Sequence, residues 1–278
     1  MATIDPREAL RRHGLRPSKG LGQNFLVDRR ALRRIVEAAE LGPADTVLEV
    51  GPGIGQLTRL LAARAGRVVA VELDLRMVAA LREELAGCRN VEVVQGDILA
   101  LDPGALAGRE AYKVVANLPY YITSAAIRHL LEARPPPSLL VLTVQREVAD
   151  RITSAPGNMS LLSVSVQFYG RPQRVARIPA SAFYPPPRVE SAIVRIDVYP
   201  QPPLRGDDAR RFFEIVRAGF SQRRKQLRNT LAAGLGLPTE QVAAALRQAG
   251  VDPRRRAETL SLEEWSAISQ QLSALRAP

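Results

Sequence analysis

The chain has 278 residues, of which 46% are apolar and 24% charged, a composition that is typical of a soluble globular protein and excludes a disordered chain. No run approaches the ~18 uninterrupted apolar residues that a membrane span needs, and the acidic residues Asp5 and Glu8 disfavour a leader sequence, so we expect a cytoplasmic protein. The 39 Lys and Arg residues exceed the 28 Asp and Glu residues, and the net charge of +11 favours a polyanionic partner, either nucleic acid or an anionic membrane.

Composition also disfavours disulfide and metal chemistry. Cys88 is the only cysteine, so it cannot form a disulfide within the chain, and His13 and His129 are too far apart for a common zinc motif. We therefore expect no metal cofactor and a reducing compartment. Only three of the 39 cations are lysines, and this arginine excess fits either a biased genome composition or selection for phosphate contacts.

Apolar β-rich runs alternate with helical patterns along the first 200 residues. The runs predict strands at 46–50, 68–71, 91–94, 112–116 and 139–144. The helical patterns predict helices at 28–40, 56–64, 75–86, 124–132 and 147–154. Two further β-rich segments, 163–168 and 192–198, are expected to form an antiparallel hairpin at one sheet edge. This alternation predicts an α/β fold with a Rossmann-like parallel sheet.

The composition shifts after Pro200, and the remaining pattern is helical. Helices are expected at 207–220, 223–235, 239–248 and 261–275. Thr239, Asp252 and Ser261 are plausible helix caps, and Ser261 has the capping-box spacing to Glu264. We therefore expect a first domain over residues 1–200 and a small all-α second domain over 201–278.

A glycine-rich turn, EVGPGIG at 49–55, lies between a predicted strand and a predicted helix. Gly51 and Gly53 allow a tight turn and the close approach of a ligand. Glu72, at the end of the next strand, has the position of an acid that bonds ribose hydroxyls in dinucleotide folds. Because the spacing is G-x-G-x-G and Pro52 removes an N–H donor, the pattern favours an adenosine ligand without phosphates, of which S-adenosylmethionine is the common case. A dinucleotide, or a turn without ligand, stays open.

The next strand is followed by Asp97, whose carboxylate is suited to accept a hydrogen bond from an adenine amino group, although an Asp after a strand is more often a cap or turn former. The position of Asp97 along the chain also favours a role in ligand binding. Gly51, Glu72 and Asp97 follow three successive strands, and open α/β sheets bind ligands at the carboxyl ends of their strands.

The fourth strand is followed by Asn117-Leu118-Pro119-Tyr120. An exocyclic amine on an aromatic base is a poor nucleophile, because its lone pair is delocalised into the ring. The Asn117 side-chain oxygen and the carbonyl of Leu118 or Pro119 are suited to hold its two hydrogens and favour a pyramidal nitrogen, while the base stacks on Tyr120. The alternative is a structural turn in which Asn117 caps the next helix.

These motifs together resemble a known enzyme family. The resemblance is to the ribosomal RNA adenine N6,N6-dimethyltransferases, and more closely to their small-subunit branch. It runs from about Lys19 to the C-terminus and is carried by GQNFL at 22–26, EVGPGIG at 49–55, NLPY at 117–120 and FYPPPRVES at 183–191.

The resemblance implies two sets of site residues. It implies contacts with the cofactor S-adenosylmethionine at Asn24, Leu26, Gly51, Glu72, Asp97 and Asn117, to which Gly53 of the turn is added. It implies a target-base pocket built from Asn117, Leu118, Pro119, Tyr120 and Phe183. Phe183 would cover the face of a flipped adenine opposite Tyr120. The resemblance further implies transfer of two methyl groups to each of two adjacent adenines near the 3′ end of small-subunit (16S) rRNA.

A basic run follows the predicted helix at 207–220. Arg217, Arg224 and Arg228 lie at helical intervals, which favours a cationic helix face directed at phosphates. The expected RNA-binding residues are Arg217, Arg223, Arg224, Lys225 and Arg228. We expect the small ribosomal subunit or its rRNA as the partner, no membrane, and a monomer.

Three other functions are compatible with parts of the pattern. The nearest is the sister branch, which methylates large-subunit rRNA at adenine N6 and confers macrolide resistance. The second is a non-catalytic ribosome-assembly or nucleic-acid-binding factor with a vestigial cofactor site. The third is a dinucleotide oxidoreductase. The sequence at 22–26, the form NLPYY and the long helical C-terminal part favour the small-subunit methyltransferase, with a role in subunit biogenesis.

Overall fold

The computed structural model describes residues 4–108 and 110–275. Within this part the chain divides into two compact units, the first of residues up to Ala149 with Arg171–Pro200 and the second of Asp150–Gly170 with residues from Gln201 onward. The expected domain boundary after residue 200 coincides with the point where the chain passes from the first unit to the second, between Pro200 and Gln201. Residues 150–170, which were expected in the first domain, instead belong to the second unit, because Met159, Val164 and Phe168 pack into its helical core.

The first unit contains a seven-stranded sheet in the order β4-β3-β2-β5-β6-β9-β7. The strands are β2 (Thr46–Val50), β3 (Arg67–Glu72), β4 (Val91–Gln95), β5 (Tyr112–Asn117), β6 (Leu139–Gln145), β7 (Gly170–Ile178) and β9 (Ser191–Val198). β4, β3, β2, β5 and β6 run parallel, which confirms the predicted parallel sheet, and β9 is antiparallel to β6. The register aligns Val50 with Val71 and Ala116, so the carboxyl ends of these strands lie at one edge.

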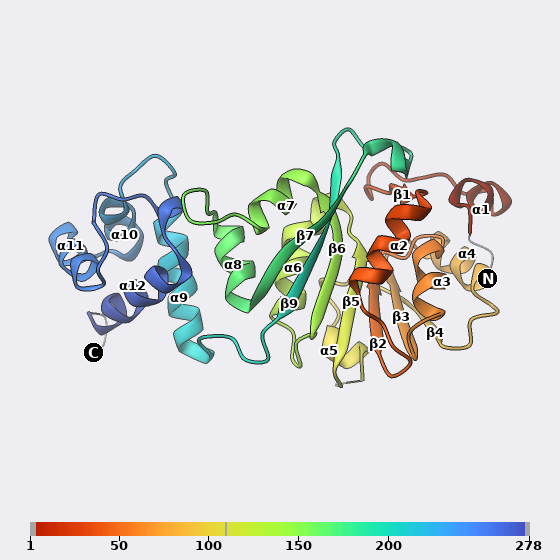
Figure 1. Ribbon diagram of the computed structural model, residues 1–278, viewed down its shortest axis with the longest axis horizontal. Helices are drawn as coiled ribbons and strands as arrows, with labels where there is room; N and C mark the ends of the chain where they lie inside the picture. Colours follow the sequence, from red (N-terminus) through yellow and green to blue (C-terminus); the bar gives the residue numbers. More distant parts are fainter. Residues whose placement is uncertain (1–3, 109, 276–278) are drawn as a thin grey trace. The chain divides into compact units, whose positions relative to one another are not determined.

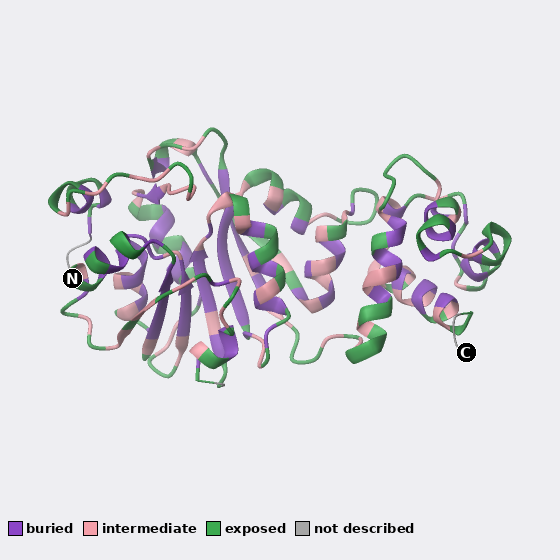
Figure 2. Ribbon diagram, turned by 180° about the vertical axis from the view of Figure 1, so that it is seen from behind, coloured by how far each residue is buried: buried purple, intermediate pink, exposed green. Residues whose placement is uncertain are grey.

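Helices cover both faces of this sheet (Figure 1). They are α1 (Pro6–Arg12), α2 (Arg29–Ala38), α3 (Gln56–Ala62), α4 (Leu75–Glu84), α5 (Pro103–Leu106), α6 (Thr123–Leu131) and the 3₁₀ turns η1 (Tyr120–Ile122) and η2 (Ala180–Ala182), while α7 (Arg146–Ile152) crosses the boundary between the units. α2 begins after Asp28, whose carboxylate accepts a hydrogen bond from the Ala31 N–H, as expected for a helix cap. Figure 2 shows mainly buried residues in the central strands of the sheet.

A separate two-stranded sheet joins the N-terminal loop to the segment before β9. It consists of β1 (Phe25–Leu26) and β8 (Phe183–Tyr184), which pair antiparallel with Leu26 opposite Phe183. Two of the sequence motifs are therefore hydrogen-bonded to each other.

The predicted strand at 163–168 is wrong. This segment lies in α8 (Leu161–Tyr169), which begins with a capping box between Ser160 and Ser163. Val164 and Phe168, four residues apart, pack on one helix face into the second core. The strand that pairs with β9 at the sheet edge is β7, whose side chains are largely exposed, so it lacks the apolar run on which the prediction depended.

The second unit is helical, as expected, with a core around the fully buried Trp265 and Phe212. Its helices are α8, α9 (Gly206–Gly219), α10 (Leu227–Leu235), α11 (Thr239–Gln248), α12 (Leu262–Ala274) and the 3₁₀ turn η3 (Ala257–Thr259). The Ser261 capping box is confirmed, but Pro238 and not Thr239 is the N-cap of α11. The helix expected from residue 223 begins only at Leu227, because residues 220–226 form the turns between α9 and α10.

Candidate active site

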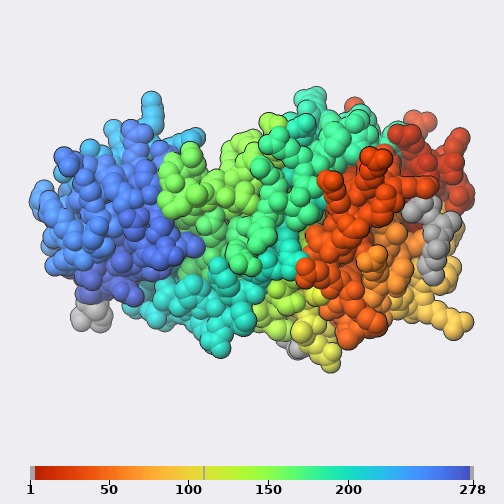
Figure 3. Space-filling view, in the orientation of Figure 1, coloured from red at the N-terminus to blue at the C-terminus, as the bar shows by residue number. Residues whose placement is uncertain are grey.

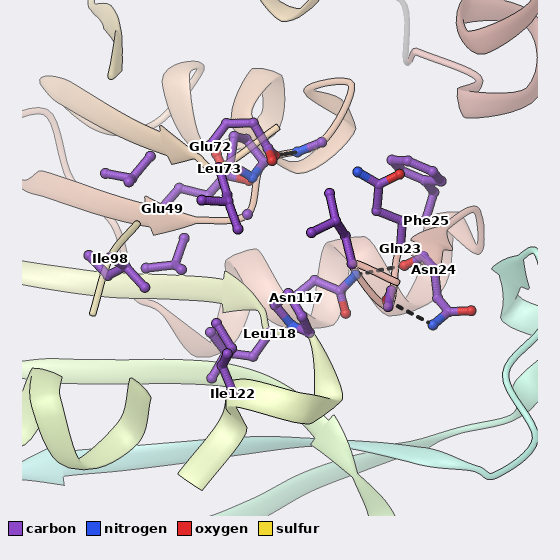
Figure 4. A pocket seen from close by; sticks show the side chains of 18 of the residues that line it. Gln23, Asn24, Phe25, Glu49, Glu72, Leu73, Ile98, Asn117, Leu118 and Ile122 are labelled. Atoms are coloured by element: carbon purple, nitrogen blue, oxygen red, sulfur yellow. Dashed lines mark hydrogen bonds between the residues drawn. The ribbon is translucent and has the colours of Figure 1, made fainter. Parts of the chain in front are cut away.

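A cavity lies at the carboxyl ends of β2, β3, β4 and β5 (Figure 4). Gly51, Glu72, Asp97 and Asn117, one from each strand end, all line it, as the strand order predicted. The loop 21–26 forms another part of its wall. The cavity therefore brings together three of the sequence motifs, which are far apart along the chain.

The glycine turn is held by backbone geometry and close packing. Gly51 and Gly53 have φ angles of 68° and 59°, in the left-handed region that favours glycine. A Cβ at Gly53 would also lie 2.7 Å from the Phe25 ring. The Gly53 N–H donates to Glu72 Oε2 at 3.0 Å. Because this N–H is bonded to a carboxylate, it is not free for a pyrophosphate, which agrees with a ligand that has no phosphates.

Glu72 is a buried carboxylate in a fixed orientation. Its Oε1 accepts a hydrogen bond from the Asp74 N–H at 2.9 Å, while Oε2 is bonded to Gly53. Burial raises the pKa of Glu72, and the two backbone donors counteract that effect. Two backbone donors thus orient an acceptor at the end of β3, where a ribose would present its hydroxyls.

Asn117 is oriented by the loop that closes the cavity. Its Nδ2 donates to the Asn24 carbonyl at 3.0 Å, and the Asn24 Nδ2 in turn donates to the Gly22 carbonyl at 3.1 Å (Figure 4). With the amide nitrogen committed to this bond, the Asn117 Oδ1 is the atom left to accept a hydrogen bond at the cavity.

In the Asn-Leu-Pro-Tyr turn, the carbonyl groups of Leu118 and Pro119 differ in how they are used within the chain. The Pro119 carbonyl accepts hydrogen bonds from the Thr123 hydroxyl at 3.1 Å and the Ile122 N–H at 3.2 Å. These bonds close η1 and the first turn of α6. Because the Pro119 carbonyl is used within the chain, the Leu118 carbonyl is favoured as the second acceptor for an amine, and this stays a prediction.

Tyr120 lines the cavity from the turn η1. Its hydroxyl lies 2.7 Å from the Ser191 Oγ at the start of β9. Burial raises the pKa of the Tyr120 hydroxyl, so the ring is neutral at physiological pH. The contact links the Asn-Leu-Pro-Tyr motif to the last residue of the motif at 183–191.

Phe183 does not occupy the place that was expected for it. Its side chain is 2% exposed and packs in the core with Leu26 and Ile35. It is not among the residues that line the cavity. The pairing of β8 with β1 places Phe183 opposite Leu26, and the expected stacking of its ring on a base stays a prediction.

Asn24 and Leu26 both line the cavity, as expected. Leu26 is 1% exposed, and its carbonyl accepts a long hydrogen bond from the Gln56 Nε2 at 3.4 Å. The backbone carbonyl of Asn24 also orients Asn117, because it accepts the hydrogen bond from the Asn117 side chain.

Sequence reasoning missed two polar residues that line the same cavity. Glu49 is 1% exposed and Gln56 is 5% exposed. Among the described residues, no group hydrogen-bonds to the Glu49 Oε2 or to the Gln56 Oε1. Burial raises the pKa of Glu49 to about 8. An acid inside the otherwise apolar strand β2 was a usable signal for Glu49, whereas no pattern pointed to Gln56.

The expected cationic helix face is wrong, because the basic residues lie on three elements. Arg217 is in the last turn of α9, Arg228 is in the first turn of α10, and the remaining three occupy the turns between these helices. All except the half-buried Arg228 are exposed. Arg223 lies 3.6 Å from a Glu258 carboxylate oxygen.

Residues 4–108 and 110–275 contain no cluster of at least three His, Cys, Asp or Glu side chains suited to a metal ion. No helix in that part of the chain has the length and apolar character needed to cross a membrane. His13, one of the two histidines, lies 2.9 Å from a Glu84 carboxylate oxygen.

The family model of ribosomal RNA adenine dimethylases matches residues 15–274 of the chain. The chain belongs to this family. Ribosomal RNA small subunit methyltransferase A of Dehalococcoides mccartyi is 49% identical over 94% of the chain and 90% of its own length. The protein of the same name from Pelotomaculum thermopropionicum is 48% identical over 95% of the chain and 94% of its own length.

Solved structures of similar proteins share this fold. The 23S rRNA methyltransferase ErmE is 35% identical, with a TM-score of 0.73, covering 90% of the chain and 100% of ErmE. A dimethyladenosine transferase from Plasmodium falciparum is 24% identical, with a TM-score of 0.78, covering 90% of the chain and 98% of that protein. This adenine dimethylase therefore has the expected Rossmann-like methyltransferase sheet.

Proposed function

We propose that this protein transfers methyl groups from S-adenosylmethionine to N6 of two adjacent adenines near the 3′ end of 16S rRNA. The observation that carries the proposal is the Asn117 amide, which Asn24 orients so that Oδ1 is left as an acceptor at the cavity bounded by Glu72 and Asp97. The small-subunit branch is supported by identities of 48–49% to small subunit methyltransferases, against 35% to ErmE. We further propose that the enzyme acts as a cytoplasmic monomer on the small subunit or its rRNA.

The cavity fits the cofactor without invoking phosphate contacts. Glu72 at the end of β3 would hold the ribose hydroxyls, and Asp97 after β4 would hold the adenine amino group. The residues that would hold the amino-acid end lie on β2 and at the start of α3. There the unpartnered Glu49 Oε2 and Gln56 Oε1 are suited to accept hydrogen bonds from its ammonium group. S-adenosylmethionine supplies an electrophilic methyl group when it is bound.

The acceptor side of the site prepares a weak nucleophile. The Asn117 Oδ1 and the Leu118 carbonyl accept the two N6 hydrogens and favour a pyramidal nitrogen, whose lone pair is then directed at the methyl carbon. Positioning of this kind contributes up to roughly 7–11 kcal/mol. Stacking of the base on Tyr120 contributes about 1–3 kcal/mol, which offsets part of the cost of extruding the base. Methylation would make an N6 proton acidic enough to pass to water, so no strong base among the residues of the chain is needed.

Labelled methyl transfer to isolated ribosomal subunits tests the proposal. Unmethylated small and large subunits are incubated separately with the enzyme and labelled cofactor, and the modified adenines are mapped by mass spectrometry. We expect label on two adjacent adenines near the 3′ end of small-subunit rRNA. Label confined to large-subunit rRNA would instead support the activity that the name of ErmE describes.

A calorimetric titration tests the alternative of a non-catalytic assembly factor. S-adenosylhomocysteine should bind with measurable heat, because the cavity retains Gly51, Glu72, Asp97 and Asn117. An absence of heat at millimolar ligand together with intact RNA binding would support the assembly factor and contradict the methyltransferase.

A further inference from the structure

A groove lined by arginines lies between α2 and β7 in the first unit. Arg30 and Arg34 on α2 and Arg177 on β7, here called the groove arginines, line it together with Asp28 and an apolar floor that includes Ile178. Arg30 and Arg34 are one helical turn apart, a rise of about 6 Å. In Figure 3 the orange-red α2 lies beside the green segment that contains β7, on the same face of this unit.

The groove arginines carry charges that the protein does not neutralise. All three are exposed, and within the part of the chain that the structure describes none forms an ion pair or a side-chain hydrogen bond. The carboxylate of Asp28 is already engaged, because its Oδ1 caps α2 by accepting from the Ala31 N–H at 2.7 Å. Glu37, on the exposed side of α2, is the other acid of this helix.

Arg195, near the other end of α2, differs from the groove arginines because its charge is neutralised within the chain. Its guanidinium bonds both Glu40 and Asp197 and also donates to the Ala38 carbonyl at 2.9 Å, which fastens the end of α2 to β9. These two carboxylates and one carbonyl satisfy most of its donors. The groove arginines have no such partners, so their charges are available to an external anion.

We propose that the groove arginines bind backbone phosphates of the rRNA substrate beside the target adenines. The proposal rests on the proposed function. α2 connects the two places, because Leu32 on α2 lines the cofactor cavity while Arg30 and Arg34 line the groove. Guanidinium groups suit phosphate because their planar donors match its oxygens. This surface belongs to the first unit and is separate from the basic residues between α9 and α10 in the second.

Charge-matched variants test the proposal. The test variant is Arg30→Gln/Arg34→Gln/Arg177→Gln, and the control is Arg64→Gln/Arg82→Gln/Arg89→Gln, which removes the same charge around α3 and α4. The probe is a fluorescent RNA hairpin with the 3′-terminal sequence of 16S rRNA, titrated by anisotropy between about 50 and 200 mM salt. Calorimetry with S-adenosylhomocysteine shows whether each variant retains a folded cavity.

We expect the test variant to bind the hairpin at least tenfold more weakly. The slope of log affinity against log salt should fall by roughly 2–3 units, since each lost phosphate contact removes about 0.7–0.9. The control should stay within about twofold of the native protein. The proposed RNA-binding role of the groove would be contradicted if both variants weakened binding equally, or if the test variant bound as tightly as the native protein. Methylation of small subunits by the native protein would still support the proposed function in that case.

Discussion

Asn117 is the residue on which the proposed chemistry depends most directly. Its position after β5 follows from the sequence, but its orientation depends on the Asn24 carbonyl, 93 residues earlier in the chain. The cavity places this amide among groups suited to hold a cofactor, so the loss of its side chain should separate catalysis from binding.

Asn117→Ala should abolish methylation, with a rate loss of at least about 100-fold, as is typical when an oriented hydrogen-bonding group is removed from a reacting centre. RNA binding should stay within a few-fold, because it depends mainly on basic residues elsewhere. Single-turnover methylation and anisotropy with the rRNA hairpin measure the two effects. Equal losses in both would show that Asn117 has no specific role in the reaction.

Gln56 should affect the amino-acid end of the cofactor and not its adenosine. Gln56→Leu removes the unpartnered Oε1, so we expect S-adenosylhomocysteine to bind about tenfold more weakly, the loss of one hydrogen bond to a charged group. Binding of 5′-methylthioadenosine, which lacks the amino-acid end, should be unchanged. Gln56→Glu keeps an acceptor and serves as the matched control. Calorimetry in which both ligands weaken equally would indicate a general distortion of the cavity.

Glu49 should make stability depend on pH. Its pKa is raised to about 8 by burial, against an ordinary value of 4.5, so the folded chain keeps a proton that the unfolded chain loses. The free energy of unfolding therefore falls as pH rises from about 4.5 to 8.

Glu49→Gln removes this dependence, whereas Glu72, which also has a raised pKa and whose charge raises that of Glu49, is present in both proteins. The variant should match the native protein near pH 5 and exceed its stability at pH 8 by on the order of a few kcal/mol. Urea unfolding at the two pH values measures the difference. A constant difference would mean that Glu49 does not titrate in this range.

At the scale of elements, the turn η1 and the strand β9 meet at one hydrogen bond. The Tyr120 hydroxyl and the Ser191 Oγ are 2.7 Å apart, although the two residues belong to separate motifs. This bond fixes the ring that we propose stacks on the target base. Ser191 is therefore a positioning residue for Tyr120.

Ser191→Ala should lower the methylation rate several-fold through the altered position of Tyr120, while S-adenosylhomocysteine binding is unchanged. In a Tyr120→Phe background, which already lacks the hydroxyl, the same change should have little further effect, since the two groups act through one bond. Ser165→Ala, which removes an exposed hydroxyl on α8, is the control. Additive losses in the double variant would exclude this coupling.

Element prediction succeeded where burial and pattern agreed. The parallel strands β2, β3, β5 and β6 are mostly buried and apolar, and α2 begins at its Asp28 cap, so local sequence patterns were sufficient to predict them. The prediction was wrong at 163–168, where Val164 is β-branched but packs together with Phe168 from one helix face into the second core. Tertiary packing overrode intrinsic propensity there.

At the scale of the whole molecule, the two units have separate hydrophobic cores. The core of the second unit surrounds Trp265, Phe212 and Phe168, and it contains no residue of the cofactor cavity. Damage to this core should therefore reduce the stability of the second unit without removing the cofactor site.

Phe212→Ala should destabilise the second unit by about 3–5 kcal/mol, because it leaves a cavity at a fully buried position. Binding of S-adenosylhomocysteine should persist, while binding of the rRNA hairpin weakens with the loss of the basic surface. Hydrogen exchange and calorimetry measure the two effects. The exposed Glu240→Ala on α11 is the control and should change stability by less than about 0.5 kcal/mol. Loss of cofactor binding in Phe212→Ala would show that the units do not behave independently.

The sequence by itself determined the parallel sheet and the positions of Gly51, Glu72, Asp97 and Asn117 at the ends of its strands, because strand periodicity and glycine turns are local properties of the chain. Only the tertiary structure decided which atoms of the site residues have hydrogen-bond partners within the chain and which remain able to bind a ligand. The Asn24–Asn117 and Tyr120–Ser191 bonds, the burial of Phe183 and the unpartnered oxygens of Glu49 and Gln56 all depend on contacts between distant segments. Such contacts are set by packing and by the satisfaction of buried polar groups, which no local pattern encodes.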